Sequence, residues 1–152
     1  MVAYLRDLGV EVFEFIDGWR ASSNLDFQQQ AIRHRALQGL KSFNDQPLLK
    51  QNKTVFDMLD EHIEQVKALR VPFSADAIWL HKQVQRAQQA LQAAGLDLVP
   101  CMNDTLAGNF MLNAQDDIRL VDFEYASNND RCYEFALWFG EMFFTPKIEQ
   151  EL

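Results

Sequence analysis

Glycine-rich stretches are missing from this 152-residue sequence. A phosphate-binding loop needs closely spaced glycines, because its backbone N–H groups must approach the phosphates. The six glycines here stand far apart, at Gly9, Gly18, Gly39, Gly95, Gly108 and Gly140. The sequence therefore contains no glycine-rich loop of the kind that cradles a nucleotide.

Long apolar runs and a disulfide framework are also absent. No stretch of about 18 apolar residues occurs, which argues against a membrane-spanning helix. The two cysteines, Cys101 and Cys132, have no metal-ligand spacing, so we expect reduced, buried thiols. The first residues lack a basic region followed by an apolar stretch, so we expect no signal peptide and a cytoplasmic protein.

Positive charge is scarce as well. The chain has 14 Lys and Arg against 22 Asp and Glu, a net charge of −8. Binding to nucleic acids requires clustered Lys and Arg, so we expect neither a nucleic-acid partner nor a membrane partner. The histidines His34, His62 and His81 have no neighbours at metal-ligand spacing, which favours surface positions.

The pattern of apolar residues predicts a mainly helical α+β fold. Apolar residues three or four positions apart predict helices at residues 27–43, 54–69 and 74–94, and a last helix over 131–144 that Pro146 ends. Alternating residues between Gly9 and Asp17-Gly18 predict a strand over 10–16.

Two further strands are predicted in the second half of the chain. Residues 109–112 and 118–121 are short apolar segments, and the polar residues 113–117 between them are typical of a turn. These segments predict a β-hairpin. Except for the segment between Leu5 and Trp19, nothing before residue 97 resembles a strand.

The hairpin brings together residues that are suited to phosphoryl transfer. Asp104 lies five positions before Asn109, and Asp122 ends the hairpin. Phosphoryl transfer needs magnesium, which prefers carboxylate and amide oxygens, and a carboxylate that orients the attacking hydroxyl. An Asp, an Asn five positions later and a second Asp after a hairpin match the kinase template. Alternatively, the acidic residues are solvated turn formers, which is the interpretation favoured for Asp116 and Asp117.

These motifs resemble the choline/ethanolamine kinase family, which has a protein-kinase-like fold related to the aminoglycoside phosphotransferases. Residues 99–109 read Val-Pro-Cys-Met-Asn-Asp-Thr-Leu-Ala-Gly-Asn, and residues 121–126 read Val-Asp-Phe-Glu-Tyr-Ala. The family carries His-Asn-Asp-x4-Asn and then Ile/Val-Asp-Phe-Glu-Tyr. The Phe-Glu-Tyr sequence favours the choline/ethanolamine branch. Similarity to the family continues through Arg131 and Glu134 to Glu141.

The resemblance implies a role for each matching residue. Asp104 would be the catalytic base, and Asn109 and Asp122 would bind Mg²⁺ and, through it, ATP. Glu124 would lie beside the metal. The segment 12–16 would correspond to the linker between two lobes, where backbone groups meet adenine. The expected substrate is choline, ethanolamine or a related amino alcohol.

The sequence departs from the family in two respects. Met102 stands where the family has a histidine that helps to hold the loop. The glycine-rich loop and a strand lysine before the linker are both missing, so the N-terminal lobe of the family would be absent. We therefore expect residues 1–20 to be a hinge-like strand from that lobe and residues 21–152 to be the helical C-terminal lobe. A fragment of this kind is expected to be inactive alone.

Substrate-binding residues are expected in the last part of the chain. A choline-type cation is held by aromatic faces and by carboxylates. Candidates are Glu124, Tyr125, Arg131, Trp138 and Glu141. The alternative is that the aromatic residues of the last helix form its core-facing side.

Three interpretations remain open on the sequence alone. The chain is one lobe of an active amino-alcohol kinase, or a non-catalytic remnant that binds or dimerises, or part of an aminoglycoside-type phosphotransferase. A lobe without its partner would expose an apolar surface between the lobes, and such a surface favours a homodimer.

Overall fold

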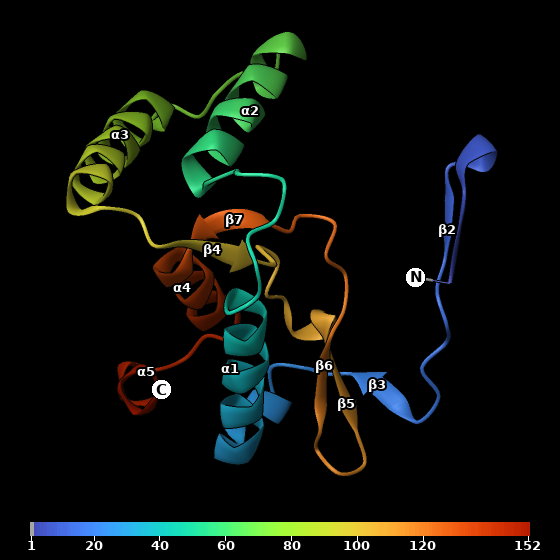
Figure 1. Cartoon of the computed structure of the whole chain (residues 1–152). Coiled ribbons are helices and arrows are strands. Elements are labelled where there is room, and N and C mark those ends of the chain that lie inside the picture. Colours follow the sequence, from blue (N-terminus) through green and yellow to red (C-terminus); the bar gives the residue numbers. More distant parts are fainter. Residues whose placement is uncertain (1) are drawn as a thin grey trace.

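The computed structural model describes residues 2–152 and confirms the mainly helical α+β class (Figure 1). Its helices are α1 (Gln30–Asn44), α2 (Val55–Ala68), α3 (Ala77–Ala94), α4 (Arg131–Glu141) and α5 (Pro146–Glu151). Its strands are β1 (Ala3–Leu5), β2 (Val10–Val12), β3 (Trp19–Ala21), β4 (Leu98–Cys101), β5 (Phe110–Asn113), β6 (Ile118–Leu120) and β7 (Ser127–Asp130). None of the helices in the described part of the chain is long and apolar enough to cross a membrane.

The strands form three small antiparallel sheets, β1–β2, β3–β5–β6 and β4–β7. The predicted hairpin is confirmed as β5 and β6, with Phe110 opposite Leu120 and Leu112 opposite Ile118. Phe110 and Leu112 are buried while the residues that alternate with them are half-buried. This alternation is the two-residue period expected of a strand with one face in the core.

The N-terminal strand differs from its prediction. Of the predicted range 10–16, only Val10–Val12 is a strand, and it pairs with β1. The expectation of no other strand before residue 97 is wrong, because β1 and β3 are both strands. Residues 13–16 carry no strand assignment. The alternation of apolar and polar residues over 10–16 does not mark a half-buried strand here, because every residue from Val10 to Phe15 is exposed.

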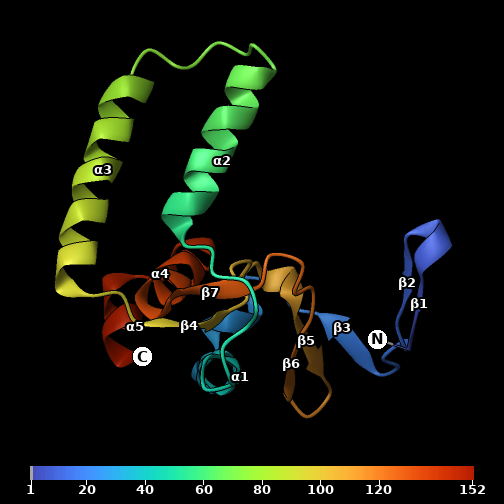
Figure 2. The ribbon, with the colours of Figure 1, turned by 45° about the horizontal axis from the view of Figure 1, so that its top comes forward.

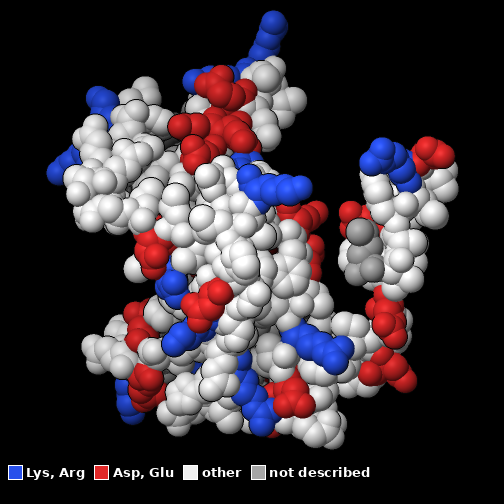
Figure 3. All heavy atoms as spheres, in the orientation of Figure 1, with Lys and Arg blue, Asp and Glu red and all other residues white. Residues whose placement is uncertain are grey.

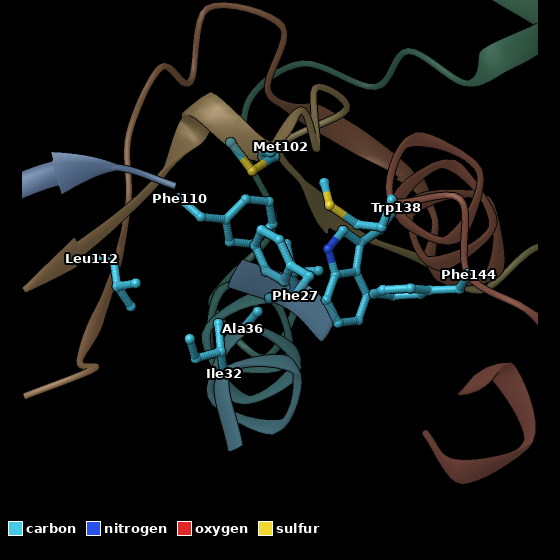
Figure 4. Packing of buried hydrophobic residues seen from close by; sticks show 11 residues of the cluster. Phe27, Ile32, Ala36, Met102, Phe110, Leu112, Trp138 and Phe144 are labelled. Carbon is cyan, nitrogen blue, oxygen red and sulfur yellow. The ribbon is translucent and has the colours of Figure 1, made fainter. Parts of the chain in front are cut away.

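The main hydrophobic core lies between α1, the β5–β6 hairpin and α4. Trp138 of α4 is fully buried, and its ring meets the rings of Phe27 and Phe144 edge-on at 6.1 and 5.3 Å (Figure 4). Phe110 of β5 also packs against Phe27, with 5.3 Å between the ring centroids. The helical stripe of α1 supplies Ile32 and other small and branched residues to this cluster, which confirms the predicted inward face of that helix.

Helices α2 and α3 project from the body of the molecule as a two-helix arm (Figure 2). Helix α2 begins as predicted, because the side chain of Thr54 accepts from Asp57 N and the carboxylate of Asp57 accepts from Thr54 N. Helix α3 begins at Ala77, three residues after the predicted Ser74, because Ala77 N closes a turn onto Ser74 O.

The last predicted helix, over residues 131–144, is confirmed as α4 but is shorter, and a separate helix that was not predicted, α5, begins at Pro146. Helix α4 ends at Glu141, and Phe143 then adopts a left-handed backbone conformation with φ of 53°. The amide of Phe144 closes the helix end by donating to Phe139 O. Pro146 begins α5, where its fixed φ and missing N–H suit a first turn, and Thr145 caps that helix.

Candidate active site

The proposed base and one proposed metal ligand are joined directly. A 3-10 turn from Ala107 to Asn109 follows the loop of Asp104 and returns the chain toward it. Asn109 Nδ2 donates to both the main-chain oxygen and Oδ2 of Asp104, at 2.9 Å each. The oxygen of the same side-chain amide, Asn109 Oδ1, accepts no hydrogen bond from residues 2–152, so it remains available to a ligand.

The second proposed metal ligand follows the hairpin. Val121 N donates to Asn109 O at 3.0 Å, so the residue before Asp122 is paired with Asn109 itself. Asp122 is exposed and has a left-handed backbone with φ of 65°. Such a conformation is uncommon for a residue other than glycine and is concentrated at functional sites.

The donors present are suited to Mg²⁺. Asn109 Oδ1 and the carboxylate of Asp122 are hard oxygen ligands, and neither is engaged by another side chain of residues 2–152. Across the described chain, no three His, Cys, Asp or Glu side chains converge on one point. A magnesium site here would therefore depend on the Asn109 amide as well as on carboxylates.

Glu134 is a component of the site that the sequence analysis noted only as part of the family pattern. Its carboxylate is fully buried in α4 and accepts from the main-chain amides of Met102 and Asn103, at 2.5 and 3.3 Å. The other oxygen accepts from Asn44 Nδ2 at 2.6 Å. Burial raises the pKa of Glu134, although these hydrogen bonds act in the opposite direction. The spacing Arg131-x-x-Glu134 was the signal that pointed to it.

Glu124 and Tyr125 lie next to a small pocket. The pocket has a volume of about 90 Å³ and lies between the loop after Asp122 and the first turns of α2. Its other lining residues are Gln51, Lys53, Met58, Glu61 and His62. Tyr125 is 57% exposed, and Lys53 forms an ion pair with Glu61 at 2.5 Å. The lining thus combines an aromatic ring with two carboxylates.

The remaining three substrate candidates lie elsewhere. Arg131 is the first residue of α4, and its guanidinium is held by Asp97 at 3.0 Å and by Asp45 at 3.4 Å. Glu141 is half-buried at the end of α4, where its main-chain oxygen accepts from Asn24 Nδ2 at 2.6 Å. Neither residue lines the pocket beside Tyr125.

The interpretation of Trp138 as a pocket wall is corrected by the structure. Its side chain is fully buried among aromatic rings of the core, so it presents no face to a ligand. Met102 is likewise fully buried in that cluster and holds its loop by apolar packing. Met102 therefore contributes apolar packing at the position where the resemblance implied a histidine.

The sequence is similar to those of known choline and ethanolamine kinases. A family model for choline/ethanolamine kinases matches residues 12–151. A probable ethanolamine kinase from Arabidopsis thaliana is 36% identical over 63 residues, covering 41% of this chain and 17% of that protein. Choline kinase alpha from Mus musculus is 27% identical over 118 residues, covering 68% of this chain and 26% of that protein.

Solved structures share the fold over nearly the whole chain. A choline/ethanolamine kinase family protein from Mesorhizobium loti superposes with a TM-score of 0.77 and 23% identity, over 91% of this chain and 47% of that one. The choline kinase LicA from Streptococcus pneumoniae gives a TM-score of 0.74 and 21% identity, over 97% of this chain and 56% of that one. The chain thus spans about half the length of these solved relatives, and it belongs to the choline/ethanolamine kinase family.

Proposed function

We propose that this chain is the magnesium- and substrate-binding part of an ATP-dependent kinase that phosphorylates the hydroxyl of a small amino alcohol, of the choline or ethanolamine type. The observation that carries the proposal is the tether between Asn109 and Asp104, two residues of the motif that kinase chemistry requires. The family match over residues 12–151 supports the same chemistry.

The residues of the chain have distinct tasks in the proposed mechanism. Asp104 accepts a hydrogen bond from the substrate hydroxyl and orients the oxygen toward the γ-phosphoryl group. Asn109 fixes the Asp104 carboxylate in place through its Nδ2, which leaves its own Oδ1 free to hold a metal ion. Asn109 and Asp122 would hold Mg²⁺, which when bound neutralises charge on the phosphates.

The pocket beside Tyr125 supports an amino alcohol as the substrate. Its two carboxylates, Glu61 and Glu124, and the face of Tyr125 suit a small organic cation. Lys53 offsets one of the two carboxylates, so one negative charge is left for the ligand. Arg131 and Glu141 do not line this pocket, so a substrate-binding role for them rests on the resemblance to the family alone.

The N-terminal hairpin supports the proposed organisation of the chain. Residues 1–20 are proposed to be the hinge-like part of a second lobe that covers ATP, and residues 21–152 the helical lobe. Figure 1 shows β1 and β2 standing away from the body. Phe13 and Phe15, which follow β2 in the sequence, are 63% and 86% exposed, as expected of residues that a further domain would cover.

The same exposed surface supports a second candidate function, that of a non-catalytic module that dimerises. An apolar hairpin without a covering domain favours association with a second copy. Sedimentation of the purified chain over a range of concentrations separates the two functions when it is combined with a measurement of metal binding. A dimer without metal binding favours the module, whereas metal binding at Asp122 favours the kinase.

The proposed function is tested with a fusion protein. In it, this chain follows the part of the Streptococcus pneumoniae choline kinase that precedes the superposed region. We expect ATP- and Mg²⁺-dependent phosphorylation of choline or ethanolamine by the fusion protein, and no turnover by the 152-residue chain alone. Phosphorylation of aminoglycosides without that of amino alcohols would select the antibiotic-modifying alternative. Steady turnover of choline by the chain alone would contradict its description as one part of the enzyme.

A further inference from the structure

We propose that Asn103 is a positioning residue that fastens the loop of the proposed base Asp104 to the loop of the proposed metal ligand Asp122. The two loops are separate in the sequence, and the side chain of Asn103 reaches from the first loop to Tyr125, 22 positions further along the chain. The inference rests on the proposed function, because it assigns a further role within the same site.

The side chain of Asn103 uses both its amide nitrogen and its amide oxygen, bonding to Tyr125 in the second loop and to Ser127 and Asn129 in β7. Its Nδ2 donates to Tyr125 O at 2.9 Å and to Ser127 Oγ at 2.8 Å. Its Oδ1 accepts from Asn129 Nδ2 at 2.8 Å. Tyr125 lies three residues after Asp122, so these bonds join the residue before Asp104 directly to the segment that follows the metal ligand.

The attachment is buried and is anchored on both sides. Asn103 is 8% exposed, Ser127 is 1% exposed and Asn129 is fully buried. Ser127 Oγ donates in turn to Lys53 O at 2.8 Å, and Asn103 N donates to the buried carboxylate of Glu134 at 3.3 Å. Hydrogen bonds in such a low-dielectric setting hold their geometry closely, and an unpaired partner there is costly.

The backbone of Asn103 explains why an asparagine is suited to the position. Its φ is 60°, a left-handed conformation that among non-glycine residues asparagine and aspartate adopt most readily. Glycine would adopt this conformation but offers no side chain. Aspartate would fit the backbone, but its ionised carboxylate cannot donate to Tyr125 O or Ser127 Oγ. Of these three residues, asparagine alone meets both requirements.

The proposal is tested by hydrogen exchange on the 152-residue chain itself. Three amides report on the two loops, since Asn109 N donates to Leu106 O, Val121 N to Asn109 O, and Ala126 N to Phe123 O. In the wild-type chain we expect the amides of Asn109 and Ala126 to open together, with protection factors within about threefold of each other. Protection factors that differ by more than tenfold would overturn the proposal without any variant.

Two glycine variants form a matched pair. Asn103→Gly keeps the left-handed backbone and removes the hydrogen-bonding side chain. Asp116→Gly makes the same change at φ of 61° in the exposed β5–β6 turn. In Asn103→Gly we expect exchange at Ala126 to accelerate at least tenfold, with α1 amides within threefold of wild type. Asp116→Gly should leave both unchanged, and Asn103→Asp should resemble Asn103→Gly. Uniform acceleration throughout the chain would reduce Asn103 to a structural residue.

A metal probe connects the loops to the proposed function. Mn²⁺ added with ATP is expected to broaden the amide signals of Asn109 and Asp122 in the wild-type chain, with a midpoint at least fivefold higher in Asn103→Gly. No broadening in wild type would contradict the proposed metal site, while the exchange data would still decide whether Asn103 joins the loops. An equal midpoint in wild type and variant would overturn the positioning role while leaving the metal site in place.

Discussion

Asn109 holds Asp104 at two points, its Nδ2 lying 2.9 Å from the main-chain oxygen and 2.9 Å from Oδ2 of that residue. The same amide is therefore occupied on its donor side and open on its acceptor side. This division would let one residue orient the proposed base and offer an oxygen to the proposed metal ion, and the proposed chemistry depends on that combination.

Replacing the proposed base should remove catalysis while leaving the fold intact. In the fusion protein, Asp104→Asn is expected to lower kcat by about 100-fold or more, the usual range for a positioned base. Asp104 is only half-buried, so the thermal midpoint should stay close to that of the wild type. The matched control is Asp116→Asn in the exposed turn, which should retain full activity. Equal losses in the two variants would contradict the assignment of the base.

The buried carboxylate of Glu134 should make stability depend on pH. Its pKa is raised from the ordinary value of 4.5, so the folded chain holds this proton to a higher pH than the unfolded chain does. The contribution of Glu134 to the free energy of unfolding is therefore fully present below pH 4.5 and decreases as pH rises through the raised pKa. Glu134→Gln should lose this dependence.

Urea denaturation at pH 5 and pH 8 measures that effect. Relative to Glu134→Gln, the wild-type chain should be more stable at pH 5 than at pH 8. A wild-type advantage that grows toward pH 8 would mean that the ionised carboxylate is the favoured form. Glu134→Ala should cost about 2–4 kcal/mol at either pH, because two backbone amides and Asn44 lose their acceptor.

Alanine substitutions of Trp138 and Tyr125 should distinguish a residue that packs in the core from one that contacts the ligand. Trp138→Ala removes a fully buried ring and should cost about 3–5 kcal/mol in the free energy of unfolding. Tyr125→Ala removes a ring that is 57% exposed and should leave the thermal midpoint nearly unchanged. Choline titration followed by NMR should show weaker binding to Tyr125→Ala only. A Tyr125→Ala variant that binds choline as well as wild type would remove Tyr125 from the site.

The two thiols should react at very different rates. Cys101 is buried in β4, and burial raises the pKa of its thiol to about 12, while Cys132 is exposed on α4. A thiol reagent at pH 8 should modify Cys132 in the folded chain and reach Cys101 only after unfolding, because the thiolate is the reactive form. Mass spectrometry of the labelled chain locates the modification. Rapid labelling of Cys101 in the folded chain would contradict its burial.

The sequence predicted elements whose apolar residues follow a clear period. Helix α1 and the β5–β6 hairpin bury one face each, so the spacing of their apolar residues predicted both elements. The candidate site residues Asp104, Asn109 and Asp122 could be predicted from the sequence because the spacing of the motif is tied to its chemistry.

Elements held by polar contacts gave no such signal. Strand β7 reads Ser-Asn-Asn-Asp, and three of its four residues are buried. The side chains of these polar residues are hydrogen-bonded rather than packed against apolar groups. Asn128, for example, donates to Leu49 O and to Asn52, while its oxygen accepts from Leu49 N. The burial of Glu134 could not be predicted either, because a charged residue is normally expected at the surface.

The gathering of acidic side chains on one surface was also not predicted from the sequence. Figure 3 shows acidic side chains gathered over α2, the helix that carries Asp57, Asp60, Glu61 and Glu64. Only Glu61 among these lines the small pocket beside Tyr125. The position of that pocket depends on how α2 meets the loop after Asp122, a relationship between distant segments that neither segment reveals alone.

The most direct test of the proposed chemistry is phosphate transfer by the fusion protein, followed by ³¹P NMR with ATP, Mg²⁺ and choline or ethanolamine. The account predicts formation of the phosphorylated amino alcohol, lost in Asp104→Asn and in Asp122→Asn and retained in Asp116→Asn. A folded fusion protein that binds ATP and Mg²⁺ but transfers no phosphate to either amino alcohol would contradict it.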